Sequence, residues 1–103
     1  SHQAACPMAS LNNEAARADI LNRLRRAEGQ LRGVQRMIEE GETCLQVAQQ
    51  LSAVRKALDS TYVRMTMCLV EQELGARLAA GEHSPESLKP MMDDMEKLLS
   101  RIP

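Results

Sequence analysis

The fold is decided by one uninterrupted stretch, residues 43–80, which reads TCLQVAQQLSAVRKALDSTYVRMTMCLVEQELGARLAA. Its apolar residues recur at alternating steps of four and three, the spacing of one face of an α-helix. That stripe consists of Val47, Leu51, Val54, Leu58, Thr61, Met65 and Cys68. Because no proline interrupts the stretch, we expect one long helix that needs partner helices on more than one side.

A second amphipathic stretch, residues 20–38, precedes the long one. Its stripe consists of Ile20, Leu24, Ala27, Leu31, Val34 and Ile38. Asn12 or Asn13 is suited to cap the start of this helix, and Gly41 is suited to close its end. Thr43 with Gln46 three residues later predicts a capping box that opens the long helix.

A short third helix is expected after the turn at residues 81–85. Ser84 or Ser87 is suited to cap it, and Pro90 limits how early its regular hydrogen bonding begins. Its apolar face consists of Met91, Met95, Leu98, Leu99 and Ile102. The sequence therefore predicts an all-α fold, a long helical hairpin plus a short C-terminal helix, as a single domain over residues 13–103.

Residues 1–12 are expected to form a flexible N-terminal arm. Ser1 and His2 resemble the remnant of a cleaved purification tag, and the arm also carries Cys6. If any arm ligand exists, Cys6 and His2 are the residues that would supply it.

The composition predicts an oligomer. Hydrophobic residues make up 44% of the 103 residues, but Tyr62 is the single aromatic one. A chain this small, with few helices and few large side chains, buries only a modest core by itself. We therefore expect two protomers to share a core, as an antiparallel four-helix bundle.

Charge is distributed unevenly along a chain whose net charge is −1. Residues 17–36 hold six arginines (Arg17, Arg23, Arg25, Arg26, Arg32, Arg36) against Asp19 and Glu28. From Glu71 onward, acidic residues outnumber basic ones. The protein is thus no general polycation, but the asymmetry predicts a basic face for a polyanion.

The three cysteines, Cys6, Cys44 and Cys68, are odd in number and form no CxxC pair. This pattern argues against a disulfide framework. We see no signal peptide and no apolar run of membrane length, so we expect a cytoplasmic protein without membrane contact. We also find no catalytic triad, phosphate-binding loop or paired general acid and base, and expect no enzyme activity.

Two segments carry a family resemblance. Residues 21–39 read LNRLRRAEGQLRGVQRMIE, and QQLSAVRKALD follows Cys44 at residues 49–59. Together they resemble the CsoR/RcnR family of transcriptional repressors, whose members sense metals, formaldehyde or sulfane sulfur. The resemblance implies three helices, an antiparallel dimer that is usually part of a dimer of dimers, and no helix-turn-helix. It also implies that operator DNA is bound by the free protein and released with inducer.

The resemblance implies DNA contacts at Arg23, Arg25 and Arg55. Arg26 and Arg32 extend the basic part of the first helix, so we include them among the DNA-binding candidates. Arginine suits phosphate because its planar guanidinium donates two parallel hydrogen bonds. The alternative is that these arginines only solvate the surface of a helix, as in a helical interaction module that does not bind DNA.

Cys44 is the residue for which the resemblance implies inducer sensing, although a lone cysteine is often an inert buried thiol. Steps of 25 and 29 residues from Cys44 reach Leu69 and Glu73 on the same face of a straight helix, about 40 Å away. Such residues meet only if they come from two antiparallel protomers. Leu69, Glu73 and Cys68 are thus the expected neighbours of Cys44 across a dimer.

At these positions the sequence departs from the family's metal sensors, which usually have His where this chain has Leu69 and Cys or His where it has Glu73. Leucine cannot bind a metal, and a carboxylate suits Cu(I) poorly. We therefore expect a covalent inducer, formaldehyde or sulfane sulfur, at Cys44. The alternative is Cu(I), Ni(II) or Zn(II) bound by Cys44 with unusual ligands. Cys68 lies on the apolar stripe and is expected to be a packed core thiol rather than half of a Cys44–Cys68 pair between protomers.

Overall fold

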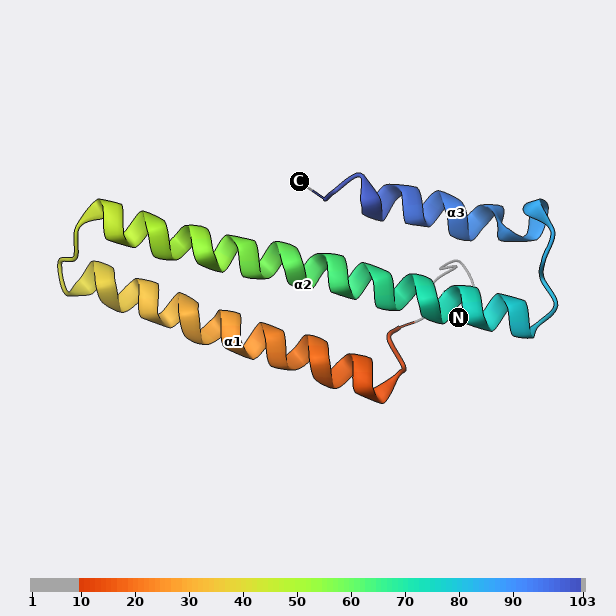
Figure 1. Ribbon diagram of the computed structural model, residues 1–103, viewed down its shortest axis with the longest axis horizontal. Helices are drawn as coiled ribbons and strands as arrows, with labels where there is room; N and C mark the ends of the chain where they lie inside the picture. The colour runs from red at the N-terminus through yellow and green to blue at the C-terminus, as the bar shows by residue number, and fades with distance from the viewer. Residues whose placement is uncertain (1–9, 103) are drawn as a thin grey trace, which may run out of the picture.

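The computed structural model describes residues 10–102, which form three helices (Figure 1). These are α1 (Glu14–Glu39), α2 (Cys44–Ala79) and α3 (Pro85–Leu99). Helices α1 and α2 form an antiparallel hairpin, and α3 folds back along the C-terminal half of α2. Helix α2 is central because it contacts both other helices, whereas α1 and α3 do not contact each other. The predicted all-α, three-helix fold is confirmed, and residues 10–102 contain no strand.

Side chains at the start of each helix satisfy backbone donors that have no partner within the helix. Asn13 Oδ1 accepts from the Ala16 amide at 2.9 Å, and Thr43 Oγ1 accepts from the Gln46 amide at 3.2 Å. Ser84 Oγ accepts from the Ser87 amide at 3.2 Å. The predicted cap at Thr43 is confirmed. For the other two helices the sequence allowed two candidate caps each, and the structure has Asn13 as the cap of α1 and Ser84 as the cap of α3.

Two glycines allow the chain to leave α1 and α2. Gly41 and Gly81 have φ angles of 77° and 79°, in the left-handed region that glycine enters without steric cost. The Glu42 amide donates to the Met37 carbonyl at 2.9 Å, and the Glu82 amide donates to the Arg77 carbonyl in the same way, also at 2.9 Å. The long hairpin is therefore closed by a short, hydrogen-bonded turn between residues 40 and 43.

The core is a narrow seam. The buried apolar residues are Ile20, Ala27, Val34, Val54 and Met91. Those of α1 are seven residues apart, so this helix buries a single stripe. Thr61 and Thr66 are also buried, and their hydroxyls donate to carbonyls one turn earlier in α2.

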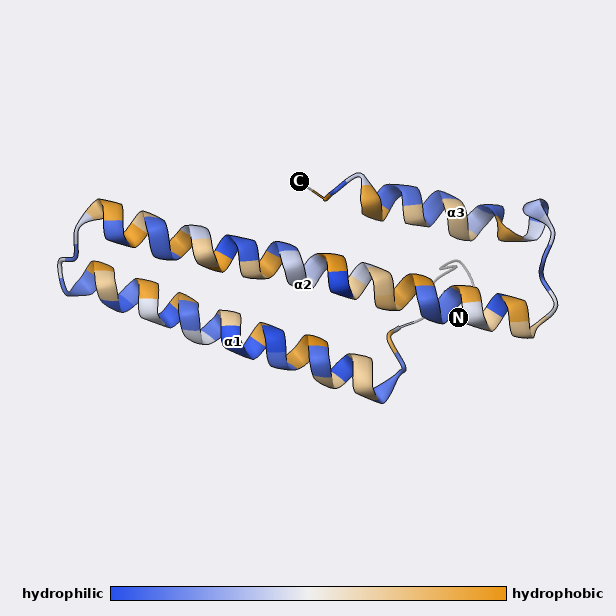
Figure 2. Cartoon of the chain, viewed as in Figure 1, coloured by the Kyte–Doolittle hydropathy of each residue, from blue (hydrophilic) through white to orange (hydrophobic). Residues whose placement is uncertain are grey.

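Much apolar surface stays exposed on the single chain. Leu51 is 50% exposed and Leu45 is 69% exposed, while Leu24, Leu31 and Leu58 are between 38% and 42% exposed. Hydrophobic residues recur along the whole of α2 (Figure 2), yet α3 covers only its C-terminal half. The half of the hairpin nearest the turn between α1 and α2 therefore has an apolar face that no other helix of the chain covers. None of the helices within residues 10–102 is long and apolar enough to cross a membrane.

Tyr62 anchors the end of α3. Its hydroxyl donates to the Leu98 carbonyl at 2.7 Å, which joins the middle of α2 to the last turn of α3. Replacing Tyr62 with Phe removes the bond but keeps the ring. We expect Tyr62→Phe to cost about 1 kcal/mol and to raise amide hydrogen exchange in α3 more than in α1. Equal exchange in α3 of the variant and the unchanged protein would contradict this role.

Candidate sensor site and nucleic-acid interface

Cys44 is the first residue of α2, directly after its cap Thr43. The cysteine is exposed and its thiol is free. It stands at the closed end of the hairpin, where the chain turns from α1 into α2. The structure therefore exposes the predicted sensor thiol to solvent at the first position of α2. The Thr43 cap sets this position, because it determines the residue at which the helix begins.

A second stripe of α2, which diverges from the apolar stripe after Leu51, links Cys44 to its expected neighbours. Steps of seven and four residues from Cys44 lead through Leu51, Arg55 and Tyr62 to Leu69 and Glu73. The first half of this stripe is exposed, whereas its second half lies under α3. Because α2 is one continuous helix, Leu69 and Glu73 lie about 40 Å from Cys44. The structure thus keeps these residues apart within one chain.

Glu73 is held by its own helix. The carboxylate is buried, with 7% of the residue exposed, and its Oε1 lies 3.9 Å from Nη2 of Arg77 one turn later. Leu69 is half-buried. Arg77 was not predicted as the partner of Glu73, although the i,i+4 spacing of their opposite charges is a signal that the sequence carries.

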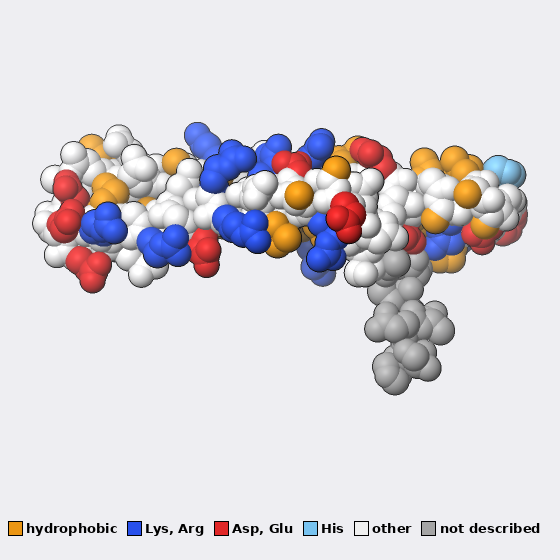
Figure 3. Space-filling model, turned by 90° about the horizontal axis from the view of Figure 1, so that it is seen from below, with side chains coloured by type: hydrophobic (Ala, Val, Ile, Leu, Met, Phe, Trp, Pro, Cys, Tyr) orange, Lys and Arg blue, Asp and Glu red, His pale blue; other side chains and the backbone are white. Residues whose placement is uncertain are grey.

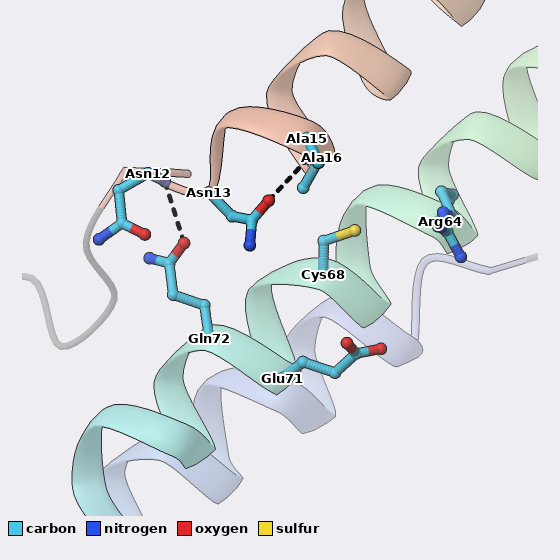
Figure 4. Close-up of a pocket in the computed structure, with 8 residues that line it drawn as sticks. All are labelled: Asn12, Asn13, Ala15, Ala16, Arg64, Cys68, Glu71 and Gln72. Carbon is cyan, nitrogen blue, oxygen red and sulfur yellow. Dashed lines mark hydrogen bonds between the residues drawn. The ribbon is translucent and has the colours of Figure 1, made fainter. Parts of the chain in front are cut away.

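Cys68 faces a different direction from the stripe that carries Cys44. It is half-buried rather than fully packed, and it lines a cavity of about 450 Å³ beside the first turn of α1. Figure 4 shows its sulfur pointing toward that turn, near Ala16. The other lining residues are Asn12, Asn13, Ala15, Arg64, Glu71 and Gln72.

Gln72 ties the start of the described chain to α2 (Figure 4). Its amide nitrogen donates to the Ser10 carbonyl at 3.0 Å, and its amide oxygen accepts from the Asn12 backbone at 3.0 Å. Residues 10 and 12, part of the expected N-terminal arm, are therefore hydrogen-bonded to α2. Cys6 and His2 lie outside the described residues.

The donor groups of one chain do not fit a copper site with three soft ligands. Cys44 is the one thiol on its stripe, Leu69 offers no donor, and the hard carboxylate of Glu73 is already paired with Arg77. Within residues 10–102, no three His, Cys, Asp or Glu side chains cluster closely enough to hold a metal ion.

Asp19 joins the two helices of the hairpin by accepting from two arginines. Arg23 Nε donates to Oδ1 at 3.1 Å, and Arg64 Nε donates to Oδ2 at 3.0 Å. These hydrogen bonds, from Arg64 first and then Arg23, hold the pKa of Asp19 below its usual value. The bond to Asp19 likewise raises the pKa of Arg64.

The five predicted DNA-binding arginines do not form one patch on a single protomer. Arg25 and Arg32 are seven residues apart on one face of α1, and both are exposed. Arg55 is nine residues before Arg64, about two and a half turns, so the two lie on opposite sides of α2. Arg55 lines an apolar groove with Leu31 and Leu51, and none of the three residues of the Asp19 bridge lines that groove. Basic side chains recur along the hairpin in the view of Figure 3. Of the remaining two candidates, Arg23 is itself part of the Asp19 bridge, and Arg26 lies three residues after it on α1.

Comparison with known sequences identifies the family. The model of the metal-sensitive transcriptional repressors matches residues 16–101, and the chain belongs to this family. The resemblance to CsoR/RcnR repressors is thereby confirmed.

Individual relatives match shorter stretches. The copper-sensing transcriptional repressor RicR of Mycobacterium tuberculosis is 54% identical over 43 residues, which are 42% of this chain and 45% of that protein. The copper-sensing transcriptional repressor CsoR of Bacillus subtilis is 36% identical over 58 residues, 54% of this chain and 57% of the relative. The matches thus span about half the length of these two relatives.

An uncharacterized protein of Serratia marcescens is 31% identical over 81 residues, 79% of this chain and 81% of its own length. No solved structure matches the chain. The names of RicR and CsoR specify copper, so they lend no support to the expected formaldehyde or sulfane-sulfur inducer.

The Asp19 bridge predicts a pH-dependent contribution to stability. Since folding lowers the pKa of Asp19, the bridge stabilises the fold above the unfolded value of about 4 and loses its effect as pH falls through the folded value. We expect Asp19→Asn to lower the free energy of unfolding at neutral pH, with the difference from the unchanged protein shrinking in acid.

Denaturant titrations over a pH series, at one protein concentration, measure this difference. Asp94→Asn is a matched control, because Asp94 has no ion pair recorded among the described residues. A difference for Asp19→Asn that stays constant across the acid range would contradict the bridge's contribution.

Proposed function

We propose that this chain is a DNA-binding transcriptional repressor that releases operator DNA when an inducer acts at Cys44. The observation that carries the proposal is the family match over residues 16–101, combined with an exposed thiol at the start of α2. The exposed arginines of the hairpin supply the charge that binding to the phosphate backbone requires.

Assembly is part of the proposal. The uncovered leucines of the hairpin, Leu24, Leu31, Leu51 and Leu58, favour a second copy packed antiparallel as a four-helix bundle. In that arrangement Cys44 of one protomer would approach the Leu69 and Glu73 end of its partner's α2. A dimer of dimers would repeat the arginines often enough to contact many phosphates.

A covalent inducer is favoured by the residues around the expected site. Leu69 cannot bind a metal, and Glu73 already has a cationic partner, so Cys44 is the one reactive group of the set. Addition to formaldehyde would form a sulfur–carbon bond, with the thiol proton ending on the new hydroxyl group. Attack on a sulfane sulfur would form a persulfide and release the thiol that carried it.

Copper is the second candidate inducer, favoured by the two copper-sensing relatives. Cys44 offers one soft ligand for Cu(I), and further soft ligands would have to come from outside its stripe. Ni(II) and Zn(II) are the other metals to compare. A metal response would mean that ligands other than Leu69 and Glu73 complete the site.

DNA binding by reduced protein tests the proposal. We expect fluorescence anisotropy with duplex DNA from upstream of the gene to show tight binding that weakens steeply with salt. Formaldehyde or a persulfide donor should release the DNA from the unchanged protein and not from Cys44→Ala. Metal-free conditions with a chelator separate this response from one to Cu(I), Ni(II) or Zn(II).

Three outcomes would overturn parts of the proposal. Release of DNA from Cys44→Ala by the same inducer would remove Cys44 as the sensor. A response that needs Cu(I) would replace the covalent inducer with copper. An absence of salt-sensitive DNA binding would favour the interaction module that does not bind DNA.

A further inference from the structure

Arg64 is a basic residue of α2 that neither the family resemblance nor the charge pattern of α1 singled out. Its side chain is 54% exposed, and its Nε donates to Asp19 of α1, 45 residues earlier in the chain. Asp19 also accepts from Arg23, whose side chain is 36% exposed. One carboxylate therefore holds two guanidinium groups, one from each helix of the hairpin.

The charges of this cluster do not balance. Two guanidinium groups and one carboxylate leave one net positive charge, because Asp19 neutralises only one of its two partners. Glu71 and Cys68 line the same cavity as Arg64, but the hydrogen bond and the ion pair recorded for the Arg64 side chain within residues 10–102 both go to Asp19. The two guanidinium groups repel each other, and the single carboxylate of Asp19 offsets only part of that repulsion. A second anion on the solvent side of the two groups would therefore stabilise the cluster.

The geometry leaves donors for that anion. Both arginines use Nε for Asp19, and no further hydrogen bond of either side chain is recorded within residues 10–102. Their terminal nitrogens thus remain available at the partly exposed edge of the cluster. A guanidinium whose Nε is anchored has lost part of its rotational freedom, which lowers the entropic cost of binding an oxyanion.

We propose that Arg64 and Arg23, held by Asp19, together bind one phosphate of the DNA backbone. Asp19 is the positioning residue, and the phosphodiester takes the place of the missing second anion. Arg26 lies three residues after Arg23 and on a neighbouring part of the α1 surface, where it can contact the next phosphate. This inference rests on the proposed DNA binding and adds a residue of α2 to it.

The salt dependence of DNA binding tests the role of Arg64. Removing one phosphate contact should lower the slope of log K against log salt concentration by about 1. We expect Arg64→Gln to show that loss, together with an affinity about tenfold lower at low salt. Arg101→Gln is the matched control, because it removes the same charge from an exposed site outside the hairpin.

Arg64→Lys shows whether weaker DNA binding by Arg64→Gln comes from loss of the phosphate contact or from a folding defect. Lysine keeps the charge but cannot bind Asp19 and a phosphate through separate edges of one planar group. It should restore the salt slope and only part of the affinity. Restoration of the full affinity would show that charge alone matters and would overturn the paired geometry.

Asp19→Asn separates positioning from simple charge. Removing an acid makes the protein more positive, so DNA binding would tighten if Asp19 only neutralised its partners. A positioning role predicts instead that affinity falls, even though both arginines keep their charge. Tighter binding by Asp19→Asn would therefore overturn the role of Asp19.

Failure of this inference can be told apart from failure of the proposed function. If the unchanged protein shows no salt-sensitive DNA binding, the repressor proposal fails. If it binds DNA and Arg64→Gln behaves like Arg101→Gln, only the role of Arg64 fails. Binding of inorganic phosphate that depends on Arg64, without any effect of Arg64→Gln on DNA binding, would assign the cluster to free phosphate and would also overturn it.

Discussion

The length of α2 is the constraint on which the rest of the structure depends. Its 36 residues form one continuous helix of about 54 Å, with apolar residues on more than one side. Helix α1 covers one side, and α3, with 15 residues, reaches over only the far half of another. The near half, from Cys44 to Leu58, therefore keeps exposed apolar side chains that a single chain cannot cover.

This constraint links sensing to assembly. Cys44 and Glu73 lie on one stripe of α2, yet the rigid helix between them keeps them apart within one chain. An antiparallel partner would bring the two ends of the stripe together and cover its exposed leucines at the same time. At the far end of the stripe Glu73 forms an ion pair with Arg77. In such a dimer, an inducer at Cys44 would lie next to this ion pair of the partner protomer.

Local features of the fold could be predicted from the sequence, because they depend on neighbouring residues. The helix periodicity, the Thr43 cap and the turn at Gly41 are all signals within a few positions. Contacts between distant residues could not be predicted. The Asp19–Arg64 pair and the hydrogen bonds of Gln72 to residues 10 and 12 depend on the register between α1 and α2, which no local pattern encodes. The half-buried position of Cys68 also depends on how α1 and α2 pack. Its place on the apolar stripe predicts a core thiol, but the cavity at the start of α1 leaves it partly exposed.

Disulfide trapping tests most directly whether the sensor site is shared by two chains. Leu69→Cys, with Cys6 and Cys68 replaced by Ala, leaves Cys44 and one new thiol, which are too far apart to bond within a chain. We predict that a mild thiol oxidant converts this variant to a covalent dimer at low protein concentration. Met67→Cys in the same background serves as the control, because Met67 is exposed on another face of α2. A variant with Leu69→Cys that stays monomeric, or cross-links no faster than the control, would contradict a site built from two protomers.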